Sequence, residues 1–179
     1  MTDAPYATIR RRILSYCVEV FVLFTGVLVL QGVIFLLGLN PLVNALNRGE
    51  SFSKAVYHLW LSGTVDFPLL LYYSFTLASP HQATLVMRWF GLRLARTDGA
   101  KVTFGQAFLR SLVMLIPFEV NHIFLVWFST PEGIPTQLAA QYAVVFGLIG
   151  LYFLAAYRSP QRQSIHDRTA GTVIVQDTN

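Results

Sequence analysis

Apolar residues form four long runs along the chain, separated by short polar segments. The runs cover residues 13–39, 57–78, 104–128 and 138–157. A helix needs about 20 mostly apolar residues to cross the hydrocarbon core of a bilayer, and each run is about that long. The pattern therefore predicts an all-α, polytopic membrane protein: a single domain, residues 1–179, with four transmembrane helices.

The composition also indicates lipid as the solvent. Hydrophobic residues make up 54% of the chain and charged residues only 12%, whereas soluble domains carry about 25% charge. The first apolar run is longer than the apolar region of a signal peptide, which has about 7–15 residues. No small-residue cleavage site follows it, so we expect an uncleaved helix.

Basic residues predict the orientation of the four spans. Lys and Arg are concentrated in cytoplasmic loops of membrane proteins. With four spans, ten of the thirteen basic residues fall on one side, and only Arg48 and Lys54 fall on the other. We therefore expect a multi-pass membrane protein with both termini in the cytoplasm. The net charge of +4 then reflects topology, and we expect membrane lipids rather than nucleic acid as partners.

Two linkers carry patterns of their own. In the loop between the second and third runs, alternating residues flank an Asp98-Gly99 turn signal, which predicts a hairpin-like loop on the cytoplasmic face. The C-terminal stretch TAGTVIVQ is a further short strand-like run, too short to span. Residues 40–56 form either a short interfacial helix or a plain loop.

Three stretches together resemble the RDD family of small bacterial membrane proteins. They are Arg12 with Glu19 seven residues later, the stretch ATLVMRWFGLRLARTDGAKVTFGQAFLRSL at 83–112, and RQSIHDRTAGTVIV at 162–175. The family is named for one arginine and two aspartates. The resemblance places the arginine at Arg12 and the second aspartate at Asp167, with Glu19 in place of the first. It implies a location in the bacterial cytoplasmic (inner) membrane and a link to transport, including cation/proton exchange.

Five ionisable residues stand out inside the apolar runs: Glu19, Asp66, Arg110, Glu119 and His122. A charge at the centre of a spanning helix costs about 2.5–3.5 kcal/mol or more, so such residues face protein or water and are functional candidates. Glu19 and Arg110 each lie six residues past the cytoplasmic start of a run, at a depth of about 9 Å. We expect them to pair. The pair is either structural or part of proton or cation handling by Glu19; otherwise Arg110 reaches the lipid headgroups.

Asp66 lies about halfway along the second run, two residues before Pro68. A proline inside a helix frees the carbonyl four residues earlier, and helix breaks near the midplane are where transporters bind ions. Asp66 is therefore either an ion or proton site, or a neutral carboxyl bound to a hydroxyl of a neighbouring span.

Glu119 and His122 stand one turn apart near the outer end of the third run. Di-metal bundles use Glu-x-x-His pairs, but they need two such pairs and two further glutamates. Apart from the two histidines, no feature of the sequence supports a haem held by His58 and His122. We therefore expect no metal and no cofactor. The pair is interpreted as a polar outer vestibule with Asn121, or as hydrogen bonds to neighbours.

His166 and Asp167 follow the last run, and no serine or cysteine stands in a nucleophile context, so no catalytic residues and no enzyme are expected. Asp167 either pairs with Arg12 or belongs to a solvated tail. The sequence favours an accessory or scaffold subunit of a larger membrane assembly, as a homo-oligomer or with other membrane subunits. The alternative is a small oligomeric transporter or cation/proton exchanger that uses intramembrane carboxylates.

Overall fold

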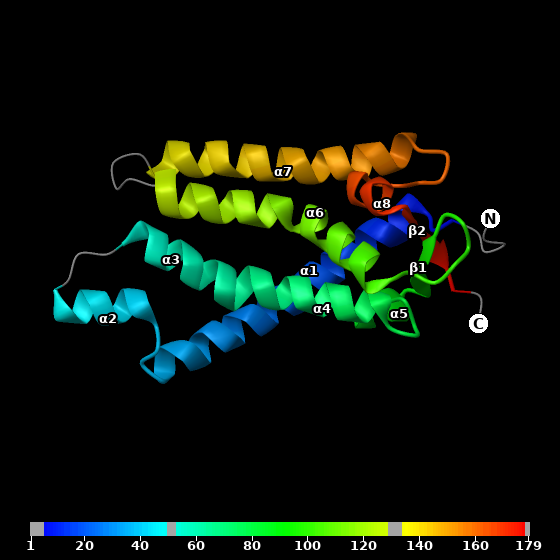
Figure 1. Cartoon of the computed structure of the whole chain (residues 1–179). Helices are drawn as coiled ribbons and strands as arrows, with labels where there is room; N and C mark the ends of the chain where they lie inside the picture. The colour runs from blue at the N-terminus through cyan, green and yellow to red at the C-terminus, as the bar shows by residue number, and fades with distance from the viewer. Residues whose placement is uncertain (1–5, 50–52, 129–133, 178–179) are drawn as a thin grey trace.

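Helices dominate the computed structural model, which describes residues 6–49, 53–128 and 134–177 (Figure 1). Three stretches are helical, long and apolar enough to cross a membrane. They are α1 (Ile9–Leu36), α6 (Phe104–Ile123) with its π-helical continuation η2 (Phe124–Phe128), and α7 (Ile134–Arg158). These helices coincide with three of the four predicted runs.

The remaining predicted run is helical but interrupted. It consists of α3 (Lys54–Leu61), the π-helix η1 (Ser62–Asp66) and α4 (Phe67–Ala78) in direct succession. The N–H of Phe67 donates to the carbonyl of Ser62, five residues back, and the wide turn precedes a proline that has no N–H to donate. This segment is not among the three that are long and apolar enough by composition, so its membrane crossing stays a prediction.

Side chains and glycines set the ends of these helices. The Thr8 hydroxyl accepts from the N–H of Arg11 at the start of α1, and Thr103 forms a capping box with Gln106 at the start of α6. Gly38, at φ +67°, follows the end of α1, so this helix ends a little before the predicted limit. The segment after it contains α2 (Pro41–Arg48), which decides for a helix over a plain loop there.

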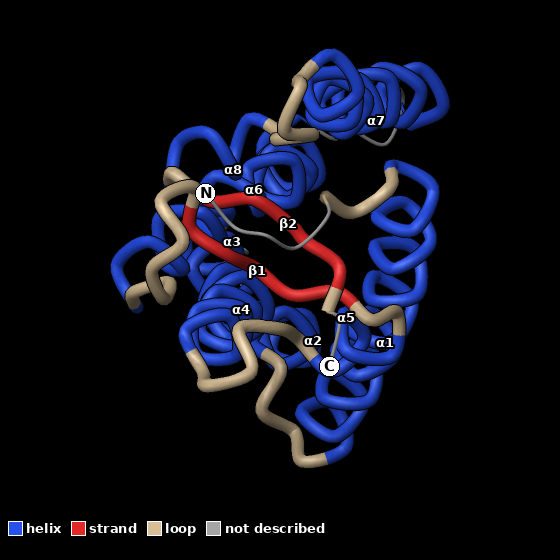
Figure 2. Tube along the Cα trace, turned by 90° about the vertical axis from the view of Figure 1, so that its right-hand side faces the viewer, coloured by secondary structure: helices blue, strands red, loops and turns tan. Residues whose placement is uncertain are grey.

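A two-stranded sheet closes one end of the helices (Figure 2). Strand β1 (Leu92–Arg96) pairs antiparallel with β2 (Thr172–Gln176). The predicted hairpin within the central loop is therefore wrong, whereas the strand-like C-terminal run is a strand. Thr103 already caps α6, so too few residues follow the Asp98-Gly99 turn to form a second strand. The apolar C-terminal run supplies the partner instead.

The apolar core lies beneath this sheet, where the helix ends meet two short helices, α5 (Leu85–Trp89) and α8 (Ile165–Ala170). Leu77, Leu92 and Leu94 are fully or almost fully buried there. In the apolar part of α6, 28% of the residues are buried, against 11% in α1 and 6% in α7. The first and last described residues meet the sheet: Tyr6 forms a bridge with Val175, and the N–H of Asp177 donates to the carbonyl of Gly91. The sheet end is therefore the packed part, and α1 and α7 present most of their length outward.

Candidate functional site

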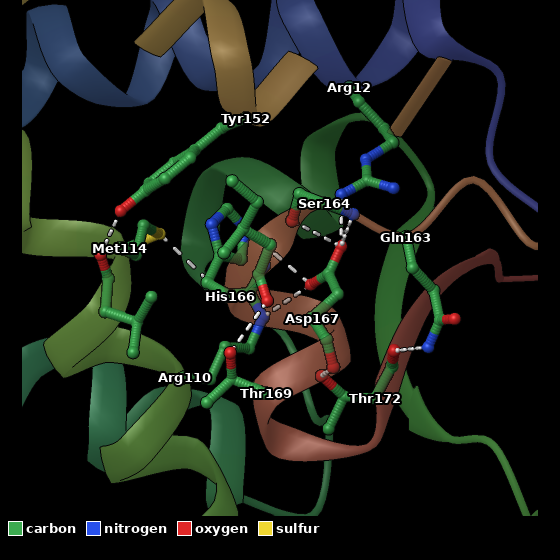
Figure 3. Close-up of polar contacts among 12 residues, drawn as sticks. Arg12, Arg110, Met114, Tyr152, Gln163, Ser164, His166, Asp167, Thr169 and Thr172 are labelled. Carbon is green, nitrogen blue, oxygen red and sulfur yellow. Dashed lines mark hydrogen bonds and ion pairs between the residues drawn. The ribbon is translucent and has the colours of Figure 1, made fainter. Parts of the chain in front are cut away.

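Asp167 lies at the centre of a buried polar cluster at the sheet end (Figure 3). Its carboxylate accepts from Arg12 Nη2 at 2.5 Å and from Arg110 Nε at 2.9 Å. The backbone N–H and the hydroxyl of Ser164 donate to it at 3.1 and 2.8 Å. The side chain of Asp167 is 0% exposed. All four donors converge on one carboxylate, so its hydrogen-bonding capacity is fully used.

Three elements distant in sequence are joined through Asp167. Arg12 comes from α1, Arg110 from α6, and Asp167 itself from α8. Arg12 also donates to the backbone carbonyl of Arg162, in the loop before α8. This loop turns sharply, with Arg162 at a φ of 53°. The cluster therefore ties both ends of the chain to the third apolar helix.

Charge explains why Asp167 stays ionised. Burial alone raises the pKa of a carboxyl, but the adjacent guanidinium groups of Arg12 and Arg110 outweigh burial and hold the pKa of Asp167 well below its usual range. Two cations nevertheless face one anion, which leaves an excess of positive charge inside the protein.

His166, next to Asp167, is a buried and neutral imidazole. Burial, together with the charges of Arg110 and Arg12, lowers its pKa to about 3, against the opposing charge of Asp167. Its Nε2 lies 3.7 Å from Asp167 Oδ1, and its ring meets that of Tyr152 edge-on, with centroids 5.3 Å apart. The Nδ1 atom is buried and has no hydrogen-bond partner among the described residues.

Glu19 faces the same region from α1, but not as predicted. Arg110 gives its Nε to Asp167, and a second nitrogen lies 3.7 Å from the sulfur of Met114, so the expected Glu19–Arg110 ion pair is wrong. Glu19 and Arg110 do line one cavity, as their matching depths predict. Arg110 nevertheless pairs with Asp167, which comes from α8, a helix outside the spans. Asp167 and Arg12 do form the pair that was one of the two alternatives.

A cavity of about 70 Å³ separates Glu19 from the ionised cluster. Its polar lining includes Glu19, Tyr16, Tyr73, Arg110, Tyr152 and His166. A single water needs about 10–15 Å³ of such volume, so several waters fit. Glu19 is 5% exposed, and its Oε1 atom has no hydrogen-bond partner in the described part of the chain. Asp167 and Glu19 thus differ sharply: one carboxylate is saturated with donors, and the other has an oxygen left over.

The remaining candidate residues gather at the other end of the helices. His122 Nδ1 lies 2.8 Å from Asp66 Oδ2, and Glu119 Oε1 lies 2.8 Å from His58 Nε2. Asp66 therefore meets a histidine instead of the hydroxyl that was one of its expected alternatives. Asn121 turns away from this group and accepts from Gln141 at 2.6 Å.

Sequence reasoning missed three kinds of residue at these two sites. Ser164 stands three residues before Asp167, and this spacing is a capping signal that locates α8. The tyrosines of the cavity look like ordinary aromatic residues of apolar runs, so no sequence signal marks them. His58 was considered only as a haem ligand; it contacts Glu119, and Trp127 contacts His58, because α3 packs against both α6 and η2.

Comparison with known proteins gives one family. The model of the RDD family matches residues 6–171, which is nearly the whole chain and contains every residue of both sites. The chain belongs to the RDD family. No curated protein and no solved structure matches it. With its apolar helices, this membership identifies a membrane protein.

Proposed function

We propose that this RDD-family protein is a small membrane transporter that exchanges cations for protons, with Glu19 as the group that takes up and releases the proton. One observation carries the proposal. Glu19 is buried in an apolar helix, yet it faces a cavity of about 70 Å³ with an unpartnered carboxyl oxygen. A purely structural carboxylate at this depth is expected to be saturated with donors, as Asp167 is.

The cluster around Asp167 supports this division of roles. Arg12 and Arg110 carry two positive charges against one negative charge on Asp167. A negative charge on Glu19 balances that excess, and the exchange of a monovalent cation for a proton at this carboxylate leaves the net charge of the site unchanged. Arg12 and Arg110 line the same cavity as Glu19. The charge of Glu19 therefore interacts with the charged groups of the cluster around Asp167.

We further propose four spans in a bacterial cytoplasmic membrane, with both termini inside. The helical stretch 54–78 returns the chain to the sheet end, where α1 begins and β2 lies (Figure 1). An even number of crossings fits this arrangement and the basic residues at that end. Glu19 then lies toward the cytoplasm, in the part of α1 near the sheet end.

Reporter fusions test this topology. Fusions after Gly49 and after Glu132 are expected to report the outside, and a fusion after Asp98 is expected to report the cytoplasm. The reason is the concentration of Lys and Arg around the chain ends and the central loop. A cytoplasmic signal from the Gly49 fusion contradicts the four-span arrangement.

Ion flux in proteoliposomes tests the transport role. Wild-type protein is expected to move protons, read by an internal pH dye, when a Na⁺ or K⁺ gradient is imposed. Glu19→Gln is expected to abolish this movement because the amide carries no exchangeable acid proton, whereas Glu19→Asp, which restores the acid of the family signature, keeps it. Asp98→Asn, in an exposed loop, is the matched control.

The second candidate is an accessory or scaffold subunit, which one observation favours. Helices α1 and α7 leave large apolar side chains exposed along their length, including Phe21 and Phe146. These faces suit another membrane protein as well as lipid. A correctly assembled wild type that moves no ion under an imposed gradient removes the transporter proposal and leaves this one. Mass measurement of the complex extracted in mild detergent then identifies the partner or the homo-oligomer.

A further inference from the structure

The end of the molecule away from the sheet contains a second polar cluster that the proposed exchange at Glu19 does not use. We call it the outer cluster; it consists of His58, Asp66, Glu119, His122 and Trp127. Asp66 comes from η1, and Glu119 and His122 come from α6. Asp66, Glu119 and His122 each offer one ligand atom within 4.8 Å of the other two. Three donors at this separation can surround a single metal ion.

The donor atoms of the outer cluster are not all used within the protein. Asp66 Oδ2 meets His122 Nδ1 at 2.8 Å, but the other carboxylate oxygen, Oδ1, is buried and has no partner among the described residues. The side chains of Asp66 and His122 are only 16% and 12% exposed. Glu119, at 42% exposed, leaves the group accessible from one side. A buried carboxylate oxygen without a partner costs free energy of folding unless a hydrogen-bond donor or a cation binds it.

Two further residues hold the Glu119 carboxylate in place. The indole N–H of Trp127 can only donate, and it lies 2.8 Å from His58 Nδ1. Nδ1 therefore accepts, and the neutral ring carries its proton on Nε2, which lies 2.8 Å from Glu119 Oε1. His58 thus donates to Glu119 and is not itself a ligand. Partners of this kind orient the ligands of metal sites from outside the coordination sphere.

Both π-helices of the described structure converge on the outer cluster. Asp66 is the last residue of η1, and Trp127 lies in η2. Each π-helix packs against a helix of the other stretch. η1, which follows α3, contacts α6, and η2, which follows α6, contacts α3. π-helical turns occur frequently at functional sites, since the extra residue re-aims a side chain. Here each π-turn directs one residue into the cluster.

We propose that the outer cluster binds one divalent first-row transition-metal ion of the Zn²⁺ class, with Asp66, Glu119 and His122 as ligands. An imidazole with two carboxylates suits such a cation, whereas Ca²⁺ and Mg²⁺ prefer oxygen ligands alone. Three protein ligands leave the fourth tetrahedral position open, as in sites that exchange their remaining ligand. The Glu-x-x-His pair alone gave no metal site in the sequence analysis; the missing ligand is Asp66, from another segment.

Metal binding to purified protein tests this proposal, and it does so without any transport assay. The full chain, purified through an affinity tag without histidine and placed in nanodiscs, is titrated with Zn²⁺ by calorimetry. One Zn²⁺ per chain is expected. Titration with Co²⁺ is expected to give the intense visible absorption of a four-coordinate ion. Loss of His58 in His58→Gln is expected to weaken Zn²⁺ binding by about 10–100-fold, the usual effect of removing an orienting partner.

Removing a ligand is expected to weaken binding further, in Asp66→Asn, Glu119→Gln and His122→Gln. Gln141→Ala is the matched control, because Gln141 is polar and buried and, among the described residues, donates to Asn121 rather than to the outer cluster. Each variant is compared only if it elutes as wild type does; Glu119→Gln, the most exposed position, serves if Asp66→Asn does not fold. No saturable Zn²⁺ binding by wild type, or wild-type affinity in all three ligand variants, overturns the proposal. Neither result bears on proton exchange at Glu19.

Discussion

Asp167→Asn is expected to lower the stability of the folded protein by about 3–5 kcal/mol, the usual cost of removing one partner of a buried ion pair. The effect is large because Arg12 and Arg110 both lose their anion and stay buried, at 7% and 4% exposed. The amide keeps the shape of the carboxylate but not its charge. Thermal unfolding in detergent, read by fluorescence-detected gel filtration, measures the loss together with a fall in folded yield.

Asp177→Asn is the matched control for this substitution. Asp177 also meets an arginine at the sheet end, but its pair with Arg93 is 3.8 Å long and about one-third exposed on both sides. Exposed pairs of this kind contribute about 0–1 kcal/mol. Equal losses in the two variants contradict the view that Asp167 links the first and third apolar helices to the chain end.

Stability is expected to fall as the pH drops from about 6.5, by about 2 kcal/mol at pH 5, because of His166. Burial lowers the pKa of this histidine to about 3. Between the ordinary pKa of histidine and that value, the unfolded chain binds a proton that the folded protein does not. Acid therefore favours unfolding throughout this interval. The pKa of Asp167 is held below its ordinary range, so this carboxylate adds no loss until the pH is lower still.

Melting temperatures measured from pH 7.5 to pH 5 check this expectation. His166→Gln is expected to flatten the pH dependence, because glutamine does not titrate. His81→Gln, at an exposed position, is expected to keep the wild-type slope. A slope that His166→Gln leaves unchanged means that His166 is not the group responsible.

Helical periodicity and run length were sufficient to predict most of the helical framework. Run 104–128 corresponds to α6 with η2, and run 138–157 lies within α7. Apolar stretches of this length are typical of helices rather than strands. The π-turn in η1 could be anticipated only as a break near Pro68. Strand pairing was beyond reach, because alternation marks β1 as a strand but does not name its partner, 80 residues away in β2.

The residues of the candidate sites could be predicted from the sequence, but which of them contact one another could not. Matching depths along the helices predicted that Glu19 and Arg110 face one region, and both line one cavity. Depth gives no information on the short helix α8, which brings Asp167 to Arg110 instead. In the same way, Asp66 and His122 were both visible as intramembrane polar residues. Their contact depends on how η1 packs against α6, which a single sequence does not contain.

Glu19 is the group on which the proposed proton exchange depends, and infrared difference spectroscopy at varied pH observes its proton directly. Protein in nanodiscs is expected to show the carbonyl band of a protonated carboxylic acid as the pH falls. Glu19→Gln should remove that band, and Asp98→Asn should retain it. The band is also expected to weaken when Na⁺ or K⁺ is added, as cation and proton compete for one carboxylate. A spectrum of Glu19→Gln identical to that of wild type contradicts exchange at Glu19.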